Sequence, residues 1–385
     1  MNPSRLLVAL ATLWLLAACS TADNSRPPAE LKPIADALPV TRLWERDTGE
    51  GTHQRYLNRM QPLLMEGRLY TVDTAGQVQA FDPISGKRLW RQDSGLQALA
   101  GPGGDAGRLV LASREGEVAL LKLRKGGFDE QWRVQVASEI RSPAVIDGDQ
   151  VFLRSVDGKL HALDATSGQR LWSASRRVPP LSLTGTSAPL VTAERVISGF
   201  DNGKLVAYNR SDGSVDWELT VSVPRGRSEI ERLVDLDGQF VLRDGVIYVS
   251  AYQGDLTAVT EAGGQVLWTR KFSSYQAVEI DDEALYLVDD NSHVWSIDRR
   301  SGSAFWKQDA LDARKLTAPR KVGKYLVVGD LEGWVHWIDT SDGRIVARSR
   351  PDVKRYLAQP LAWGDQQAIL LDATAQLFAL QLAGQ

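Results

Sequence analysis

The sequence has few reactive side chains. It contains one cysteine, Cys19, in 385 residues, which excludes an internal disulfide and thiol catalysis. Its histidines are scattered, with no pair at metal-ligand spacing, and we interpret them as structural. They are His53, His161, His293 and His336. The sequence therefore offers no histidine or cysteine metal centre.

Known catalytic motifs are also missing. There is no His-Glu-x-x-His, Gly-x-Ser-x-Gly, Ser-x-x-Lys or phosphate-binding glycine loop. Asp235-Leu-Asp237-Gly238 is similar to the start of a calcium loop, but it lacks the third oxygen ligand and the glutamate at position twelve. Net charge is −3 with no block of Lys or Arg, which argues against nucleic acid or a broad anionic-membrane surface. We expect no enzyme activity, no metal and no cofactor.

What the chain does contain is a repeat, shown best by residues 157–172. The turn Asp157-Gly158 favours positive φ and lies between the apolar runs 151–156 and 160–163, which predicts a β-hairpin. Residues 165–168 form a second turn signal that leads into a third short strand ending on a tryptophan.

The same pattern recurs along the chain at a nearly constant interval. Segments 80–90 and 296–306 repeat the frame of residues 162–172, Ala/Ser-x-Asp-x-x-Ser-Gly-x-x-x-Trp. The mean step of about 44 residues is typical of four-stranded propeller blades, and we expect most of these tryptophans to pack between blades. They are Trp44, Trp90, Trp132, Trp172, Trp217, Trp268 and Trp306.

The two ends of the repeat complete each other. Seven units are whole, whereas the eighth begins at Pro360 and has only three predicted strands. Residues 40–46 resemble a terminal strand with no blade before it, and pairing it with the last strand would remove an exposed edge. We therefore predict an all-β fold over residues 40–385: an eight-bladed β-propeller of four-stranded antiparallel blades, closed by the N-terminal strand.

The first 39 residues predict export and anchoring. Residues 1–18 have the charge and the short apolar core of a signal peptide. Leu16-Ala17-Ala18-Cys19 resembles the lipobox of bacterial lipoproteins, which implies lipidation of Cys19, and Ser20 then implies the inner, periplasmic leaflet of the outer membrane. Residues 19–39 are interpreted as a lipid-anchored flexible tether, of which residues 21–39 could span at most roughly 60 Å.

Two connections, residues 173–188 and 218–243, are longer than the repeat requires. Propeller topology places both on one face, in adjacent positions. Leu181 and Leu183 in the first, beside mixed charge in the second, fit a protein-docking site with an apolar anchor and a polar rim. Alternatively, the two leucines only stabilise their own loop.

These motifs resemble the BamB family, propeller lipoproteins of the machinery that assembles β-barrels in the outer membrane. The likeness covers essentially the whole chain and depends on the lipobox, the repeats, the loop motifs at 181–189 and 229–237, and the segment 329–337. It implies a scaffold that binds the periplasmic POTRA domains of BamA within the Bam complex, assists the folding and insertion of β-barrel proteins, and contacts the membrane only through its lipid.

By motif, the resemblance places BamA binding at Leu181, Leu183, Asp235 and Asp237. Thr184 departs from the pattern, because the family often has arginine at this position. Direct contact with unfolded barrel precursors is left open. The repeat is shared with quinoprotein dehydrogenases, so a PQQ-dependent dehydrogenase and a lipoprotein scaffold of another envelope complex remain as alternatives.

Overall fold

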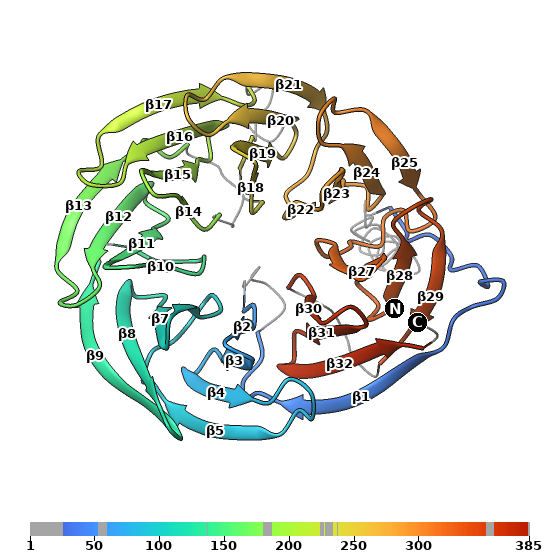
Figure 1. Cartoon of the computed structure of the whole chain (residues 1–385), viewed down its shortest axis with the longest axis horizontal. Helices are drawn as coiled ribbons and strands as arrows, with labels where there is room; N and C mark the ends of the chain where they lie inside the picture. The colour runs from blue at the N-terminus through green and yellow to red at the C-terminus, as the bar shows by residue number, and fades with distance from the viewer. Residues whose placement is uncertain are drawn as a thin grey trace, which may run out of the picture.

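A computed structural model describes residues 26–52, 60–136, 138–179, 187–223, 227, 234–236, 238–351 and 358–383. Within these ranges, 32 strands form eight four-stranded antiparallel sheets. Figure 1 shows the sheets arranged as blades around a ring, with the strands of each blade stacked from the centre outward. The predicted eight-bladed β-propeller is thereby confirmed. No helix among the described residues is long and apolar enough to cross a membrane.

We number the blades in chain order from the first blade that is continuous in sequence. Blade 1 contains β2 (Leu63–Met65), β3 (Arg68–Val72), β4 (Gln77–Phe81) and β5 (Arg88–Asp93). Blade 2 contains β6 (Gly103–Asp105), β7 (Arg108–Ala112), β8 (Glu117–Arg124) and β9 (Gly127–Gln135). Blade 3 contains β10 (Val145–Asp147), β11 (Gln150–Arg154), β12 (Lys159–Asp164) and β13 (Arg170–Ser175). Blade 4 contains β14 (Leu190–Val191), β15 (Arg195–Gly199), β16 (Lys204–Asn209) and β17 (Val215–Thr220).

The remaining blades follow the same order except at the end of the chain. Blade 5 contains β18 (Val241–Arg243), β19 (Val246–Ser250), β20 (Asp255–Thr260) and β21 (Val266–Lys271). Blade 6 contains β22 (Glu279–Ile280), β23 (Ala284–Val288), β24 (Val294–Asp298) and β25 (Ala304–Gln308). Blade 7 contains β26 (Arg320–Val322), β27 (Tyr325–Gly329), β28 (Val335–Asp339) and β29 (Ile345–Ser349). Blade 8 contains β30 (Leu361–Trp363), β31 (Gln367–Leu371), β32 (Gln376–Leu382) and, from the start of the chain, β1 (Val40–Asp47).

Blade 8 closes the ring by combining the two ends of the chain. β1 pairs antiparallel with β32, from Val40 opposite Leu382 to Asp47 opposite Gln376. Figure 1 shows this pair as a blue strand beside a red one. Because the first and last strands are hydrogen-bonded, the ring has no open seam at which another chain could pair. The predicted closure by the N-terminal strand is confirmed.

The core lies between neighbouring blades. The second and third strands of a blade are buried almost throughout, whereas the outer strand alternates, as in β13, where Trp172 is buried between exposed neighbours. Between blades 3 and 4, Phe152 and Leu160 pack with Val196 and Val206 around that tryptophan. Strands covered on both faces require continuous apolar runs, which explains the apolar segments in every repeat.

The repeated tryptophans join each blade to the next. Six of the seven indole N–H groups donate to a backbone carbonyl in the turn between the third and fourth strands of the following blade, and the indole covers the glycine of that turn. The hydrogen-bonded pairs are Trp44–Pro83, Trp132–Ala165, Trp172–Arg210, Trp217–Glu261, Trp268–Arg299 and Trp306–Thr340. The expected packing between blades is confirmed. Trp90 instead contacts Phe128 edge-on.

The segment expected to be a free tether is described from residue 26 onward. Within it, the Ala29 N–H donates to the Asp312 carbonyl and the Leu38 N–H to the Val346 carbonyl, both at 2.9 Å. Residues 26–39 therefore lie against the ring, in contrast to the free linker expected from their composition. Cys19 and the signal-peptide segment lie outside the described residues.

Candidate partner-binding face

The two long connections leave the ring on one face. In a blade of antiparallel strands, the turn between the second and third strands and the connection to the next blade emerge at the same end. The connections from β13 to β14 and from β17 to β18 therefore share this face, in neighbouring positions. We call it the connection face.

The origins of the two connections are joined by an ion pair. Arg176, directly after β13, contacts Glu218 of β17 at 2.9 Å, and its Nε donates to the Tyr208 hydroxyl at 3.1 Å. Lys204 also contacts Glu218. The hydrogen bond from Lys204, together with the charge of Arg176, lowers the pKa of the Glu218 carboxyl. This cluster holds the outer strands of blades 3 and 4 together where both loops begin.

Most of the predicted binding residues fall outside the described part of the chain: Leu181, Leu183, Thr184 and Asp237. The residues that flank the first connection are fixed. Ser187 and Ala188 are buried at its end. Near its start, the Arg176 N–H donates to the Gly158 carbonyl at 2.9 Å.

Asp235 is the predicted binding residue that the structure describes. It is 0% exposed, and its carbonyl accepts a hydrogen bond of 2.9 Å from the Tyr252 N–H in blade 5. Its carboxylate therefore lies beneath the surface and not at it. In this position Asp235 can support the loop, but it does not present its side chain to a partner.

Apolar neighbours hold the same stretch in the core. Val234 and Leu236 are buried and pack with Phe240 between blades 4 and 5. Leu236 also covers Gly199, where an added Cβ would lie 2.7 Å from the Leu236 Cβ. The C-terminal end of the second connection is thus fixed, whereas Val223 near its start is 57% exposed.

A buried ion pair that the sequence did not predict lies below this face. Arg154 is 1% exposed, pairs with Asp201, and donates to the Gly199 carbonyl. Its guanidinium lies 4.8 Å from the centre of the Phe200 ring. Arg154 thereby connects blade 3 to the turn of blade 4 that Leu236 covers.

One signal could have revealed this pair. Arg154 ends the second strand of blade 3, where the other blades have no charged residue. The equivalents are Val72, Ala112, Gly199, Ser250, Val288, Gly329 and Leu371. A lone arginine at an apolar repeat position indicates a buried partner, because an unpaired charge is too costly to bury.

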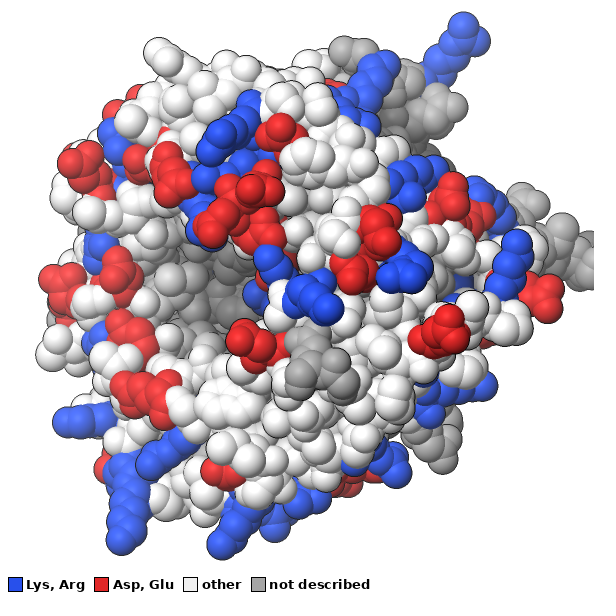
Figure 2. All heavy atoms as spheres, turned by 45° about the vertical axis from the view of Figure 1, so that its right-hand side comes forward, with Lys and Arg blue, Asp and Glu red and all other residues white. Residues whose placement is uncertain are grey.

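Charges of both signs are mixed elsewhere on the ring. Figure 2 shows acidic and basic side chains interspersed, around a hollow toward the ring centre. Among the residues that the structure describes, no group of three or more His, Cys, Asp or Glu side chains is placed to hold a metal ion.

Comparison with known proteins agrees with this architecture. Residues 74–308 match the family model of the outer membrane protein assembly factor BamB. The protein of that name from Alkalilimnicola ehrlichii is 40% identical over 98% of this chain and 97% of its own length. The crystal structure of BamB from Moraxella catarrhalis has a TM-score of 0.79 at 24% identity, covering 89% of this chain and 100% of that one.

The fold is also found in enzymes. The quinohemoprotein alcohol dehydrogenase of Comamonas testosteroni has a TM-score of 0.72 at 12% identity, with 90% of this chain and 77% of that chain covered. This likeness shows a common ring architecture alone, since function depends on sites and not on folds. The curated relative and the family model decide the family: the chain belongs to the family of the outer membrane protein assembly factor BamB.

Proposed function

We propose that this protein is a non-enzymatic scaffold of the outer-membrane β-barrel assembly complex, and that its connection face binds the periplasmic POTRA domains of BamA. The observation that carries the proposal is family membership: relatives across nearly the whole chain are named outer membrane protein assembly factors. The two adjacent connections, joined at their origins by Arg176 and Glu218, supply a suitable surface. Loops on a rigid scaffold commonly carry binding function.

The binding residues have distinct roles in this proposal. Leu181 and Leu183 form the apolar anchor, since binding energy in interfaces is concentrated in a few desolvated side chains. Asp237 belongs to the polar rim, and Thr184 replaces a charged contact with a hydroxyl. Asp235 is a positioning residue, because its side chain is buried and its carbonyl is hydrogen-bonded to blade 5.

The location follows from the same family. Lipidation of Cys19 would hold the protein at the periplasmic leaflet of the outer membrane, where the rest of the Bam complex and unfolded barrel precursors are also found. Contact with the bilayer would then be made by the lipid alone.

The site is tested by binding of purified BamA POTRA domains. Leu181→Ala with Leu183→Ala should weaken binding by about tenfold or more, which corresponds to roughly 1.4 kcal/mol. Leu171→Ala is the matched control, because Leu171 is 48% exposed on the outer strand of the same blade, away from the connection face. Unchanged thermal unfolding of both variants would show that the ring is intact.

Two outcomes would refute the site. Full affinity in the double variant removes the leucines from the interface, and equal loss in Leu171→Ala shows that any exposed leucine matters. Asp235→Asn gives a further readout. A positioning role predicts weaker binding together with faster hydrogen exchange at the Tyr252 amide, whereas a direct contact predicts weaker binding alone.

The alternative function is quinoprotein dehydrogenase chemistry, because an alcohol dehydrogenase has the same ring architecture. We expect neither binding of PQQ with calcium nor alcohol oxidation in their presence. Saturable binding or turnover would support the enzyme instead. Affinity purification from detergent-solubilised membranes separates the remaining alternative, since Bam subunits should be recovered and those of another envelope complex should not.

A further inference from the structure

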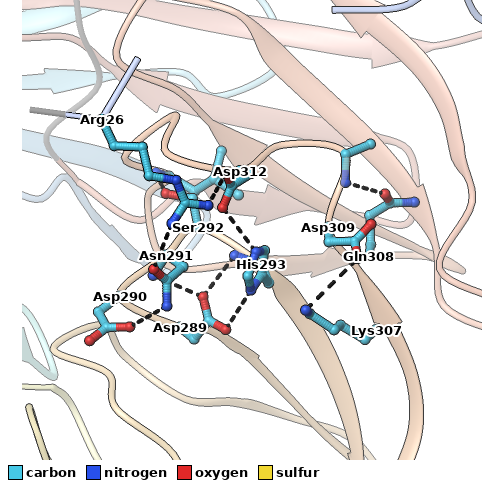
Figure 3. A network of polar contacts seen from close by, with 12 residues as sticks. Arg26, Asp289, Asp290, Asn291, Ser292, His293, Lys307, Gln308, Asp309 and Asp312 are labelled. Carbon is cyan, nitrogen blue, oxygen red and sulfur yellow. Dashed lines mark hydrogen bonds and ion pairs between the residues drawn. The ribbon is translucent and has the colours of Figure 1, made fainter. Parts of the chain in front are cut away.

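The N-terminal segment reaches the ring first at residue 26. Arg26 forms an ion pair with Asp312 and donates to the Asn291 side chain at 3.3 Å, as Figure 3 shows. Asp312 is itself held, because its carboxylate lies 3.0 Å from Nε2 of His293, whose Nδ1 lies 2.9 Å from Asp289. Arg26 therefore binds an acidic site that the turn between β23 and β24 and the connection between β25 and β26 build together.

A second fastening lies a few residues further along. Arg314 is 2% exposed, and its Nη1 donates to the Ala29 carbonyl at 2.8 Å. Its other nitrogens are occupied by Asp330, at 2.6 Å, and by Glu332. The guanidinium is thus oriented by the ring before the segment arrives, which reduces the conformational entropy lost on docking.

A third fastening repeats this design on blade 7. Arg348 donates from Nη1 to the Lys32 carbonyl at 3.2 Å and from Nε to His336 Nδ1 at 3.2 Å. Buried His336 is held in turn by Asp330 through Nε2, at 3.0 Å. The same buried Asp330 therefore orients Arg314 directly and Arg348 through His336.

Apolar contacts accompany the polar ones. Leu31 packs against the core cluster of blades 6 and 7 that contains Leu311 and Leu326. Leu38 packs with Val40 against the cluster between blades 7 and 8. Leu31 and Leu38 remain partly exposed, but an unattached linker would bury neither of them.

The path of the segment fixes where it leaves the ring. It runs antiparallel to the outer strand β29, from Lys32 beside Arg348 to Leu38 beside Val346. The C-terminal end of β29 lies on the connection face, as do the turn and the connection that bind Arg26. Arg26 therefore emerges on the face that carries the two long connections.

We propose that residues 26–39 form a strap docked in a preformed site on blades 6 to 8, and that the strap places the lipid anchor beside the connection face. The second half depends on the lipidation of Cys19 proposed above. With the strap docked, only residues 20–25 remain as linker, so the acylated residue lies within about 25 Å of Arg26. A free segment up to β1 would reach about 70 Å. The connection face is thus held close to the lipid headgroups, and a partner binds it there.

The strap is tested on the mature chain with Cys19→Ser. This substitution removes the native thiol, so that spin labels attach only to cysteines introduced for the purpose. Spin labels at Glu30→Cys and Lys324→Cys report the distance from the strap to the opposite face, since both residues are exposed. A docked strap gives one narrow distance distribution. Arg26→Ser with Leu31→Ser should broaden it, whereas Lys32→Ser should not, because Lys32 contributes only its carbonyl. A broad distribution without these substitutions would overturn the strap.

The placement of the anchor is tested on the acylated full chain, in vesicles of phosphatidylethanolamine and phosphatidylglycerol with a quencher on the headgroups. A fluorophore at Val223→Cys, on the connection face, should be quenched severalfold more than one at Lys324→Cys, and Arg26→Ser with Leu31→Ser should remove the difference. Equal quenching at both positions overturns the placement while leaving the strap intact. Failure of the acylation itself appears separately, as vesicle binding no stronger than that of Cys19→Ser.

Discussion

The indole of Trp44 occupies the space in which Gly86 would carry a Cβ. An added Cβ would lie 2.5 Å from indole Cδ2, and the indole N–H donates to the Pro83 carbonyl at 3.1 Å. This contact crosses the point where the ring closes, because Trp44 belongs to β1 of blade 8 and Gly86 to a turn of blade 1. The tryptophan–glycine contact that joins neighbouring blades is therefore also present where the ring closes, between blades 8 and 1.

Gly86→Ala should destabilise the ring more than Gly67→Ala. Both glycines have positive φ, +64° and +70°, but an added Cβ at Gly67 meets nothing within 4 Å. Gly67→Ala should cost about 1 kcal/mol of unfolding free energy for its backbone conformation, and Gly86→Ala about 1–3 kcal/mol more for displacing the indole. Denaturant titration measures both, and equal losses would show that the indole contact contributes nothing.

A chain that begins at Gly51 should lose the closure of blade 8. It lacks β1, so the buried strand β32 becomes an open edge that can pair with another chain. We expect a lower melting temperature and concentration-dependent association by light scattering. A chain that begins at Leu38 retains β1 and should remain monomeric. If the shorter chain also stayed monomeric and melted normally, the seam would lie elsewhere.

Asp201→Ala should be strongly destabilising. The substitution leaves Arg154, which is 1% exposed, without its carboxylate below the connection face. Breaking a buried pair costs about 3–5 kcal/mol, whereas Asp129→Ala, which removes an exposed pair with Arg124, should cost at most about 1 kcal/mol. Chemical unfolding compares the two variants. Similar small losses would mean that Arg154 is stabilised by Gly199 and Phe200 alone.

The ring should lose stability as the pH falls below about 6.5. Burial lowers the pKa of His161 to about 4. Between these values the unfolded state binds the proton and the folded state does not, so the unfolding free energy falls as the pH decreases. The stabilisation from His161 is complete above pH 6.5, and its loss amounts to at most about 3 kcal/mol by pH 4.

His161→Gln tests this linkage, because glutamine does not titrate. The unfolding free energy of the variant should depend less steeply on pH between 6.5 and 4. An unchanged slope would mean that His161 has the same pKa in the folded and unfolded states.

The blades, their number and the closure of the ring could all be predicted from the amino-acid sequence. Each of these depends on short-range features: a two-residue turn such as Asp157-Gly158, continuous apolar strands, and a tryptophan at a fixed spacing. The unpaired strand at residues 40–46 was predictable because an eighth repeat lacked its fourth strand. Repetition made these features easy to recognise, since similar turns and apolar strands recur from blade to blade.

The burial of particular polar groups and the identity of their partners could not be predicted and follow from the packing of the folded ring. Asp235 belongs to a loop rich in charge, yet Val234 and Leu236 draw it into the core. Arg26 meets Asp312 across 286 positions of sequence. Such pairs have no periodicity, because they join loops and termini that lie far apart in the sequence. For that reason the composition of residues 26–39 indicated a linker, whereas the folded ring supplies the arginines and apolar clusters that bind it.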